Sequence, residues 1–139
     1  MLLLEQGPDP RAYSPLALAF LGDCVYEMMV RERLVGLANR PAGQLHALAG
    51  KQVRADAQAE GIRRLLPLLT EEEVQLYKRG RNAHTGHLPK NANRAQYQAA
   101  TGLETLFGFL YLAGRDDRLR ELFAYLVQNE TTAATESRP

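Results

Sequence analysis

The chain has 139 residues, of which 45% are hydrophobic and 24% are charged, and its formal net charge is +1. These values are typical of a single soluble domain with its own core, and no uncharged apolar run approaches the length of about 18 residues that suggests a membrane span. The single cysteine, Cys24, excludes an intrachain disulfide. It fits a reducing cytoplasm, as does the short N-terminal stretch without the basic start of a signal peptide.

The first predicted helix runs from a cap at Ser14 to about Gly36, with Pro15 at its first position, where the missing N–H costs nothing. Apolar residues surround nearly its whole circumference, a pattern that predicts a buried helix. Asp23 stands inside this apolar pattern. A buried carboxylate must be paired, protonated, hydrogen-bonded or bound to a cation, so Asp23 is a candidate functional residue.

Further helices are predicted along the rest of the chain, at residues 41–60, 62–66, 70–79, 93–113 and 117–128. Gly61 is expected to break or bend the helix that begins at residue 41. Thr70 with Glu73 forms a capping box at the start of the helix at 70–79. Residues 1–13 are expected to form an irregular arm, and residues 129–139 a disordered tail. No stretch alternates as a strand does, so the sequence predicts one all-α domain, a helical bundle.

A second apolar helix, residues 101–112, repeats the anomaly of the first with Glu104. Gly22 lies beside Asp23 and Gly108 lies one turn after Glu104, and glycines in helices allow a backbone or a ligand to approach closely. Two interpretations remain open. Either carboxylate could form a structural ion pair with an arginine from another helix, or the two could share a metal ion. With a single cysteine, a metal site would use oxygen ligands, which favours a hard cation such as Mg²⁺.

Residues 74–103 contain no Asp or Glu and carry five Lys or Arg, so this window is +5 and the remaining chain −4. Such asymmetry suggests a polyanionic partner. A loop is expected at residues 80–91, and the alternative is that its charges are merely solvated. The candidate phosphate-binding residues are Lys78, Arg79, Arg81, Asn82, His84 and Lys90.

The motif FLGDCVYE, residues 20–27, resembles the signature helix of ribonuclease III, and TGLETLFGFLYL, residues 101–112, resembles its second acidic helix. Ribonuclease III has further carboxylates where this chain has Leu16, Ala19 and Thr101. This departure, the KRGRN sequence and the Pro89-Lys90 pair resemble Mini-III, the short ribonuclease III-like enzymes that lack a double-stranded-RNA-binding domain. The resemblance extends over roughly residues 14–126.

The resemblance implies an all-α endonuclease domain that dimerises with a second copy, binds Mg²⁺ and cleaves double-stranded RNA, such as the precursor of large-subunit (23S) ribosomal RNA. Asp23 and Glu104 would be the catalytic metal ligands, and Thr101 would orient a water molecule. Phe20, which the pattern alone places in the core, would pack across the dimer. Glu27 would support the site, although its spacing favours a structural i,i+4 pair with Arg31.

Two further interpretations belong to other functional classes. A non-catalytic RNA-binding factor for ribosome assembly could keep the same fold, although loss of Asp23 or Glu104 would be expected and both are present. A helical protein–protein adaptor would not need the acid-free basic window. A ribosomal protein is a candidate auxiliary partner of the nuclease, and no membrane partner is expected.

Overall fold

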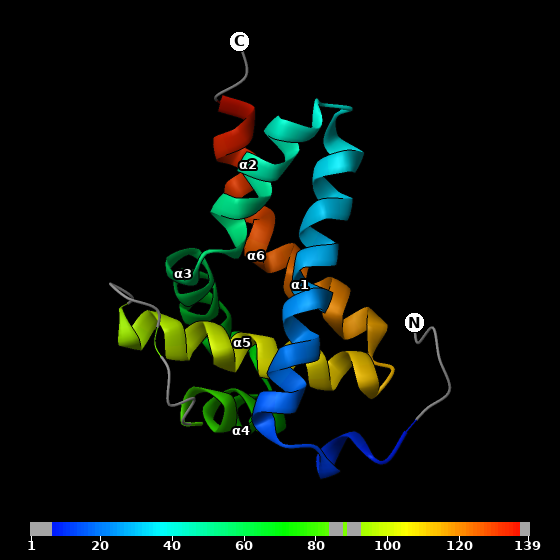
Figure 1. The fold of residues 1–139 in the computed structure, drawn as a ribbon, viewed down its shortest axis with the longest axis vertical. Coiled ribbons are helices and arrows are strands. Elements are labelled where there is room, and N and C mark those ends of the chain that lie inside the picture. Colours follow the sequence, from blue (N-terminus) through cyan, green and yellow to red (C-terminus); the bar gives the residue numbers. More distant parts are fainter. Residues whose placement is uncertain (1–6, 84–87, 89–92, 137–139) are drawn as a thin grey trace.

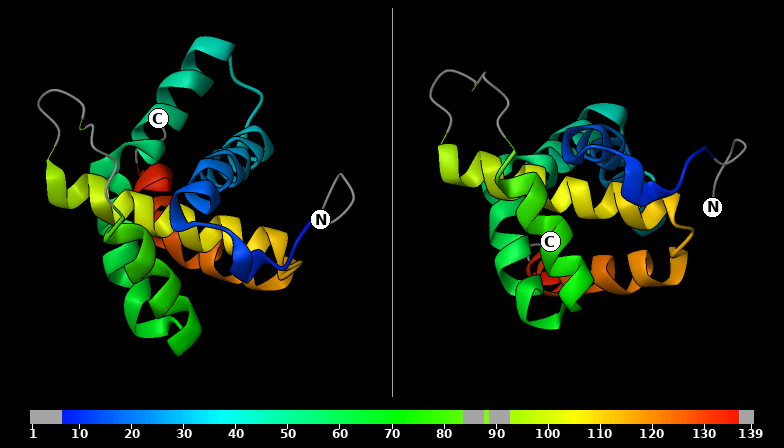
Figure 2. Two further views of the ribbon diagram at one scale, coloured as in Figure 1. Left: turned by 60° about the horizontal axis from the view of Figure 1, so that its bottom comes forward. Right: turned by 90° about the horizontal axis from the view of Figure 1, so that it is seen from below.

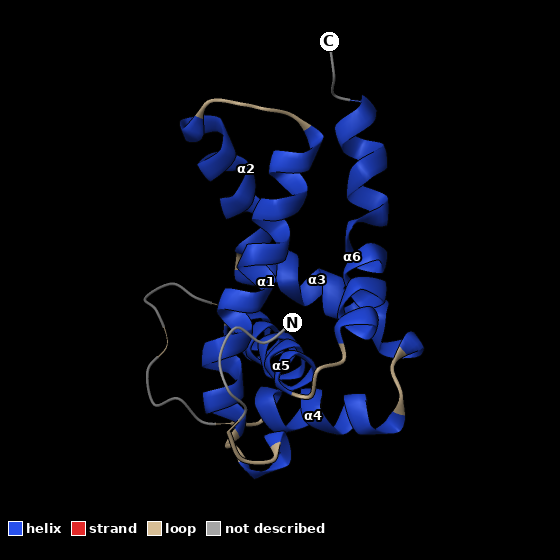
Figure 3. Cartoon of the chain, turned by 90° about the vertical axis from the view of Figure 1, so that its right-hand side faces the viewer, coloured by secondary structure: helices blue, strands red, loops and turns tan. Residues whose placement is uncertain are grey.

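The computed structural model describes residues 7–83, 88 and 93–136, and over these residues the chain is helical with no strand (Figure 3). The α-helices are α1 (Pro15–Leu37), α2 (Ala42–Val53), α3 (Ala55–Leu65), α4 (Glu71–Arg81), α5 (Arg94–Leu112) and α6 (Asp116–Glu136). Two 3₁₀ turns, η1 (Pro10–Ala12) and η2 (Leu66–Leu68), complete the described elements. The prediction of an all-α domain is confirmed.

Helix α5 lies at the centre of the bundle, where α1 crosses it and α3, α4 and α6 pack around it (Figures 1 and 2). Leu103, Leu106 and Phe107 on α5 are 0% exposed. Helix α2 packs on α1 and α3, on the outer side of the bundle. The second acidic motif of the sequence is therefore the core helix of the fold.

Helices α1 and α5 touch through their backbones at two glycines. A Cβ atom at Gly22 would overlap the carbonyl of Glu104, and one at Gly108 would overlap the carbonyl of Leu18. Larger residues at either glycine would push the two helices apart. The prediction that these glycines permit a close backbone approach is confirmed, and Asp23 directly follows the contact point.

The predicted helix ends are largely confirmed because their capping residues make the expected hydrogen bonds. Ser14 and Asn93 accept from backbone N–H groups in the first turns of α1 and α5. Thr70 and Glu73 form both bonds of the capping box at α4. Gly114, with φ of 71°, follows the end of α5 in the left-handed conformation that glycine adopts readily.

Two boundaries differ from prediction. The break between the second and third helices falls at Arg54, whose ψ is 151°, and not at Gly61, which is buried within α3. A Cβ atom at Gly61 would stand 2.7 Å from the Leu126 side chain, so this glycine admits α6 and does not end a helix. Helix α6 also runs to Glu136, past the predicted end at residue 128, whereas residues 137–139 lie outside the described residues.

The prediction that α1 is buried all round is wrong. Phe20 is 83% exposed, Val35 61% and Met28 55%, and Leu16 lies at the edge of the same surface. Asp23 is exposed as well. Hydropathy reports that α1 is apolar, but it cannot tell burial in the monomer from an apolar face left on its surface. We call these four apolar residues the α1 stripe. Of the helices described, none combines the length and apolar character that a membrane span requires.

Candidate active site

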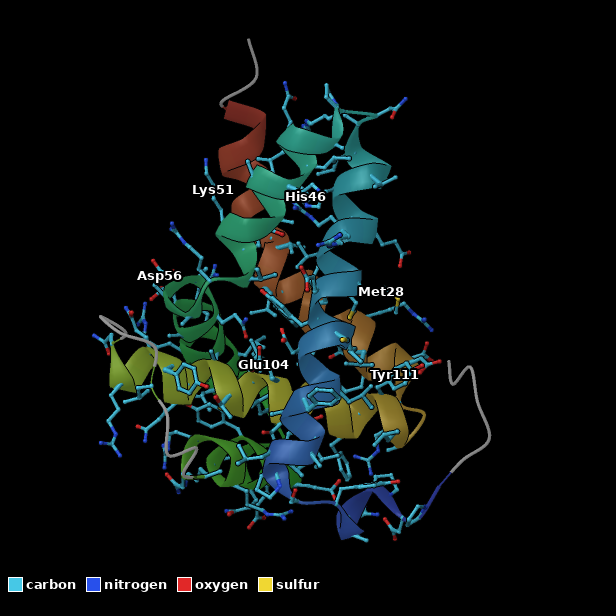
Figure 4. The ribbon with its side chains drawn as sticks, viewed as in Figure 1. Met28, His46, Lys51, Asp56, Glu104 and Tyr111 are labelled. Atoms are coloured by element: carbon cyan, nitrogen blue, oxygen red, sulfur yellow. The ribbon has the colours of Figure 1, made fainter. Side chains whose placement is uncertain are left out.

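The two predicted catalytic carboxylates meet where α1 and α5 cross. Gly22 packs against the backbone of Glu104, so the neighbouring Asp23 side chain reaches the Glu104 carboxyl and forms a hydrogen bond with it. Figure 4 shows Glu104 in the middle of α5, close to this crossing. Residues that are 81 positions apart in the sequence are thus brought together by a glycine-mediated helix contact.

The environment of Glu104 disfavours its charged form. Burial, the negative charge of Asp23 and the hydrogen bond between the two carboxyls raise the pKa of Glu104 to about 8, while a hydrogen bond from Gln58 acts in the opposite direction. Among the described residues, neither Asp23 nor Glu104 forms a salt bridge with a basic side chain. The structural ion pair considered from the sequence is therefore not observed in the described part of the chain.

Helix α3 contributes Gln58, which the sequence analysis missed. Its side-chain Nε2 donates to Val53 O at 2.9 Å and, more weakly, to Glu104 Oε2 at 3.5 Å, and the residue is 2% exposed. The sequence does contain one indication of this residue, because Gln58 is a polar residue on the buried face of α3, one turn before Ile62. It was overlooked because no pattern in the sequence indicates that this face of α3 meets α5 at Glu104.

Thr101 and Glu27, the predicted supporting residues, lie one helical turn from Glu104 and Asp23 respectively and differ in their hydrogen bonds. The Thr101 hydroxyl donates to Tyr97 O at 3.0 Å, so only its oxygen lone pairs remain for a water molecule, and its role there stays a prediction. Glu27 accepts from Arg31 at 3.0 Å on the surface of α1, which confirms the i,i+4 pair. A supporting role for Glu27 in catalysis stays a prediction.

The donor atoms at the crossing fit a hard divalent cation. Asp23 and Glu104 offer carboxylate oxygens that lie close together. Oxygen ligands are what Mg²⁺ and similar ions prefer. Within the described chain, no group of three or more His, Cys, Asp or Glu side chains is gathered around one point, so the protein would supply few ligands.

The predicted RNA-contacting residues lie in part on the C-terminal turn of α4. Lys78, Arg79 and Asn82 are exposed, and the Arg81 guanidinium lies 5.6 Å from the Tyr77 ring centroid. His84 and Lys90 lie outside the described residues. This turn is anchored at Gly80, where a Cβ atom would collide with Thr105 and Gly102 of α5. The basic end of α4 is therefore fixed to the helix that carries Glu104.

Comparison with known proteins agrees with this geometry. The ribonuclease III domain family matches residues 16–115. A Mini-ribonuclease 3 from Synechococcus is 48% identical over 117 residues, which cover 84% of this chain and 83% of the relative. A Mini-ribonuclease 3 from Symbiobacterium thermophilum is 46% identical over 114 residues, which cover 82% and 88% respectively.

The fold is also similar to a solved structure, the crystal structure of protein FN1578 from Fusobacterium nucleatum. The TM-score is 0.79 at 27% identity, and the match covers 89% of this chain and 99% of that one. The carboxylate pair at the crossing of α1 and α5 lies inside the matched ribonuclease III domain. The chain therefore belongs to the Mini-ribonuclease 3 group of the ribonuclease III family and is an endoribonuclease.

Proposed function

We propose that this endoribonuclease is Mg²⁺-dependent and cleaves double-stranded RNA in the precursor of large-subunit (23S) ribosomal RNA. The observation that carries the proposal is the contact between Asp23 and Glu104, which is formed by helix packing and has no basic partner among the described residues. Two carboxylates in contact repel when both are ionised. A divalent cation would relieve that repulsion, whereas a protein that only binds RNA would gain nothing from negative charge at its binding surface.

Asp23 and Glu104 would hold Mg²⁺ through their carboxylate oxygens. When bound, Mg²⁺ supplies Lewis acidity that activates a water molecule and stabilises negative charge developing on the phosphodiester. Thr101, one turn before Glu104, can accept a hydrogen bond from a water molecule through its oxygen and so orient it. Asp23 is exposed, so RNA can reach this side of the site.

Double-stranded RNA would be held through its phosphates by the basic end of α4. A-form RNA is recognised mainly by shape, phosphates and 2′-hydroxyl groups, so exposed Lys78, Arg79 and Asn82 suit it without reading bases. The Arg81 guanidinium lies over the Tyr77 ring, and this contact limits the orientations in which it can meet a phosphate. His84 and Lys90 extend this set in the sequence.

A second copy of the chain would cover the α1 stripe. Phe20 is too exposed to belong to the monomer core, and Leu16, Met28 and Val35 continue the apolar surface along the helix. Large exposed apolar surfaces usually mark interfaces. Symmetric packing of α1 against α1 would bury this surface, and it would bring the two Asp23-containing crossings onto one dimer. A ribosomal protein remains a candidate auxiliary partner.

The test is incubation with long double-stranded RNA, with and without Mg²⁺. We expect fragments only with the metal, and none from single-stranded RNA of the same sequence. Binding of the duplex without cleavage at any Mg²⁺ concentration would instead support the non-catalytic ribosome-assembly factor. Absence of both binding and cleavage would support a protein–protein adaptor. Precursor 23S ribosomal RNA, compared with an unrelated duplex, tests the specific substrate.

A further inference from the structure

Gln58 is the polar side chain of the α3 core face, and it connects two parts of the molecule. Its Nε2 donates to Val53 O at the C-terminus of α2 and to Glu104 Oε2 on α5. At 2% exposed, it is more deeply buried than the carboxylate that it contacts. A buried amide is expensive unless its groups are paired, so packing alone does not explain a glutamine at this position.

The hydrogen bonds fix the orientation of the amide. Both acceptors are oxygens, so the NH₂ group must face Val53 and Glu104, and Oε1 must face away from them. Oε1 is buried and has no hydrogen-bond partner among the described residues. An unpaired buried acceptor costs free energy, which a buried water molecule would recover by donating to it.

We propose that Gln58 is a positioning residue of the active site, which holds one oxygen of Glu104 from α3 and so orients the carboxylate toward the metal. This inference rests on the proposed function, because it takes Asp23 and Glu104 as the metal ligands. A partner behind a ligating carboxylate fixes its rotamer and limits its freedom before the metal arrives. Helix α3 thus orients the Glu104 carboxylate, whereas α1 and α5 supply the two charged ligands.

A purely structural role is the competing explanation. The bond to Val53 O is shorter than the bond to Glu104, and it caps one of the free carbonyls at the end of α2. Loss of that cap would lower stability without changing metal affinity. A positioning role requires that metal affinity and turnover change together while RNA binding does not.

The experiment compares Gln58→Met with the wild-type protein, because methionine has similar length and cannot hydrogen-bond to Glu104. Mn²⁺ binding measured by electron paramagnetic resonance without RNA should weaken ~10–100-fold, with kcat lowered to a similar degree and KM for RNA unchanged. Ile62→Val, a loss of one methylene on the same buried face of α3, is the matched control and should keep wild-type Mn²⁺ affinity. Wild-type Mn²⁺ affinity in folded Gln58→Met would overturn the positioning role.

Asp23→Asn distinguishes a failure of the positioning role of Gln58 from a failure of the metal site at Asp23 and Glu104. If Asp23→Asn loses Mn²⁺ binding and Gln58→Met does not, the metal site stands and the positioning role is wrong. If neither loses it, the metal site itself is wrong. Should Gln58→Met not fold, the side-chain amide of Gln58 in the ¹⁵N-labelled wild-type protein supplies the answer. Its resonance should shift on addition of Mg²⁺ and should not shift in Asp23→Asn, and an unshifted wild-type resonance would refute the role.

Discussion

The carboxylates at the start of α4 and those at the α1–α5 crossing have opposite surroundings. Glu73, almost fully buried, receives two hydrogen bonds from Arg118, at 2.7 and 2.8 Å. Glu72 receives one from Arg115 and two from Arg11. Burial alone would raise the pKa of Glu73, but bonds from Arg118 and Thr70 hold it below its usual value, and the arginines lower the pKa of Glu72.

At the crossing, by contrast, Glu104 faces Asp23, and among the described residues no arginine or lysine forms a salt bridge with either. The pKa of Glu104 is raised to about 8, the reverse of the shift on α4. The two regions thus differ in that arginines neutralise Glu72 and Glu73 on α4, whereas the pair at the crossing has no salt-bridge partner in the described part of the chain. Ionisable groups perturbed in this way are typical of functional sites.

The largest effect should come from removing either charge at the crossing. Asp23→Asn and Glu104→Gln should reduce cleavage of double-stranded RNA to background, because each removes ligand charge with little change in volume. Melting temperature in metal-free buffer should stay level or rise, since repulsion is relieved. Glu60→Gln, on the exposed surface of α3, is the control and should cleave normally. Cleavage at the wild-type rate by either site variant would show that the replaced carboxylate is not a catalytic metal ligand.

Phe20→Ala tests the surface that runs past the crossing. If Phe20 is well buried between two copies, its loss should weaken dimerisation by ~3–5 kcal/mol, the usual range for a buried phenylalanine. Because Phe20 is 83% exposed in the monomer, the free energy of unfolding of dissociated chains should hardly change. Sedimentation over a dilution series measures the dimer. An unchanged dimer would exclude Phe20 from the interface.

Arg118→Met tests the neutralised region. It leaves Glu73 buried without its counter-charge, which should lower the free energy of unfolding by about 3 kcal/mol. Arg63→Met is the control, because its partner Glu60 is exposed and such pairs contribute less than about 1 kcal/mol. Urea unfolding measures both. Equal free energies of unfolding for the two variants would contradict the claim that the buried pair contributes more to stability than the exposed pair. Cleavage by folded Arg118→Met should remain normal.

The triple variant Arg79→Ala/Arg81→Ala/Lys90→Ala tests the basic window. RNA affinity should fall similarly for every duplex sequence, and the salt dependence should become shallower by about one unit for each phosphate that the variant no longer binds. Binding across a salt series in Ca²⁺, chosen to suppress cleavage, provides the measurement. Arg63→Ala, which removes a cation from α3, should leave the slope unchanged. An unchanged slope in the triple variant would mean that RNA docks on another face.

The smallest expected effect is on stability as a function of pH. Glu104 has a pKa of about 8 in the folded chain against its usual 4.5, so the folded state binds the extra proton between these values. The metal-free protein should therefore lose stability as pH rises from 4.5 to 8. Glu72 and Glu73, with lowered pKa values, lose their contribution only as pH falls below 4.5. Urea unfolding in EDTA should show a flatter profile for Glu104→Gln, and equal slopes would contradict this.

Much of the fold could be predicted because its signals are local. Capping residues such as Ser14 and Thr70 define helix starts within a few residues of chain, and Asp23 and Glu104 are conspicuous in apolar helices. The break at Arg54 carries no comparable signal, because Gly61 is the more obvious helix breaker. The packing of Gly61 against Leu126 depends on a helix far along the chain.

The parts that could not be predicted depend on which surfaces meet. Hydropathy identifies α1 as apolar, but the exposure of Phe20 follows from the absence of a partner within one chain. Gln58 joins the site only because the α2–α3 break turns the face of α3 toward Glu104. Tertiary contacts of this kind are not encoded in any short motif.

Calorimetric titration of Mg²⁺ into the RNA-free protein at pH 6, 7 and 8 tests most directly whether the un-neutralised carboxylates are a metal site. Because Mg²⁺ must displace a proton from Glu104, affinity should rise by up to ~tenfold per pH unit and about one proton should be released per ion bound at pH 6. Glu104→Gln should show little binding at any pH. Equal affinity at pH 6 and 8, or wild-type affinity in Glu104→Gln, would show that Mg²⁺ does not bind at the crossing.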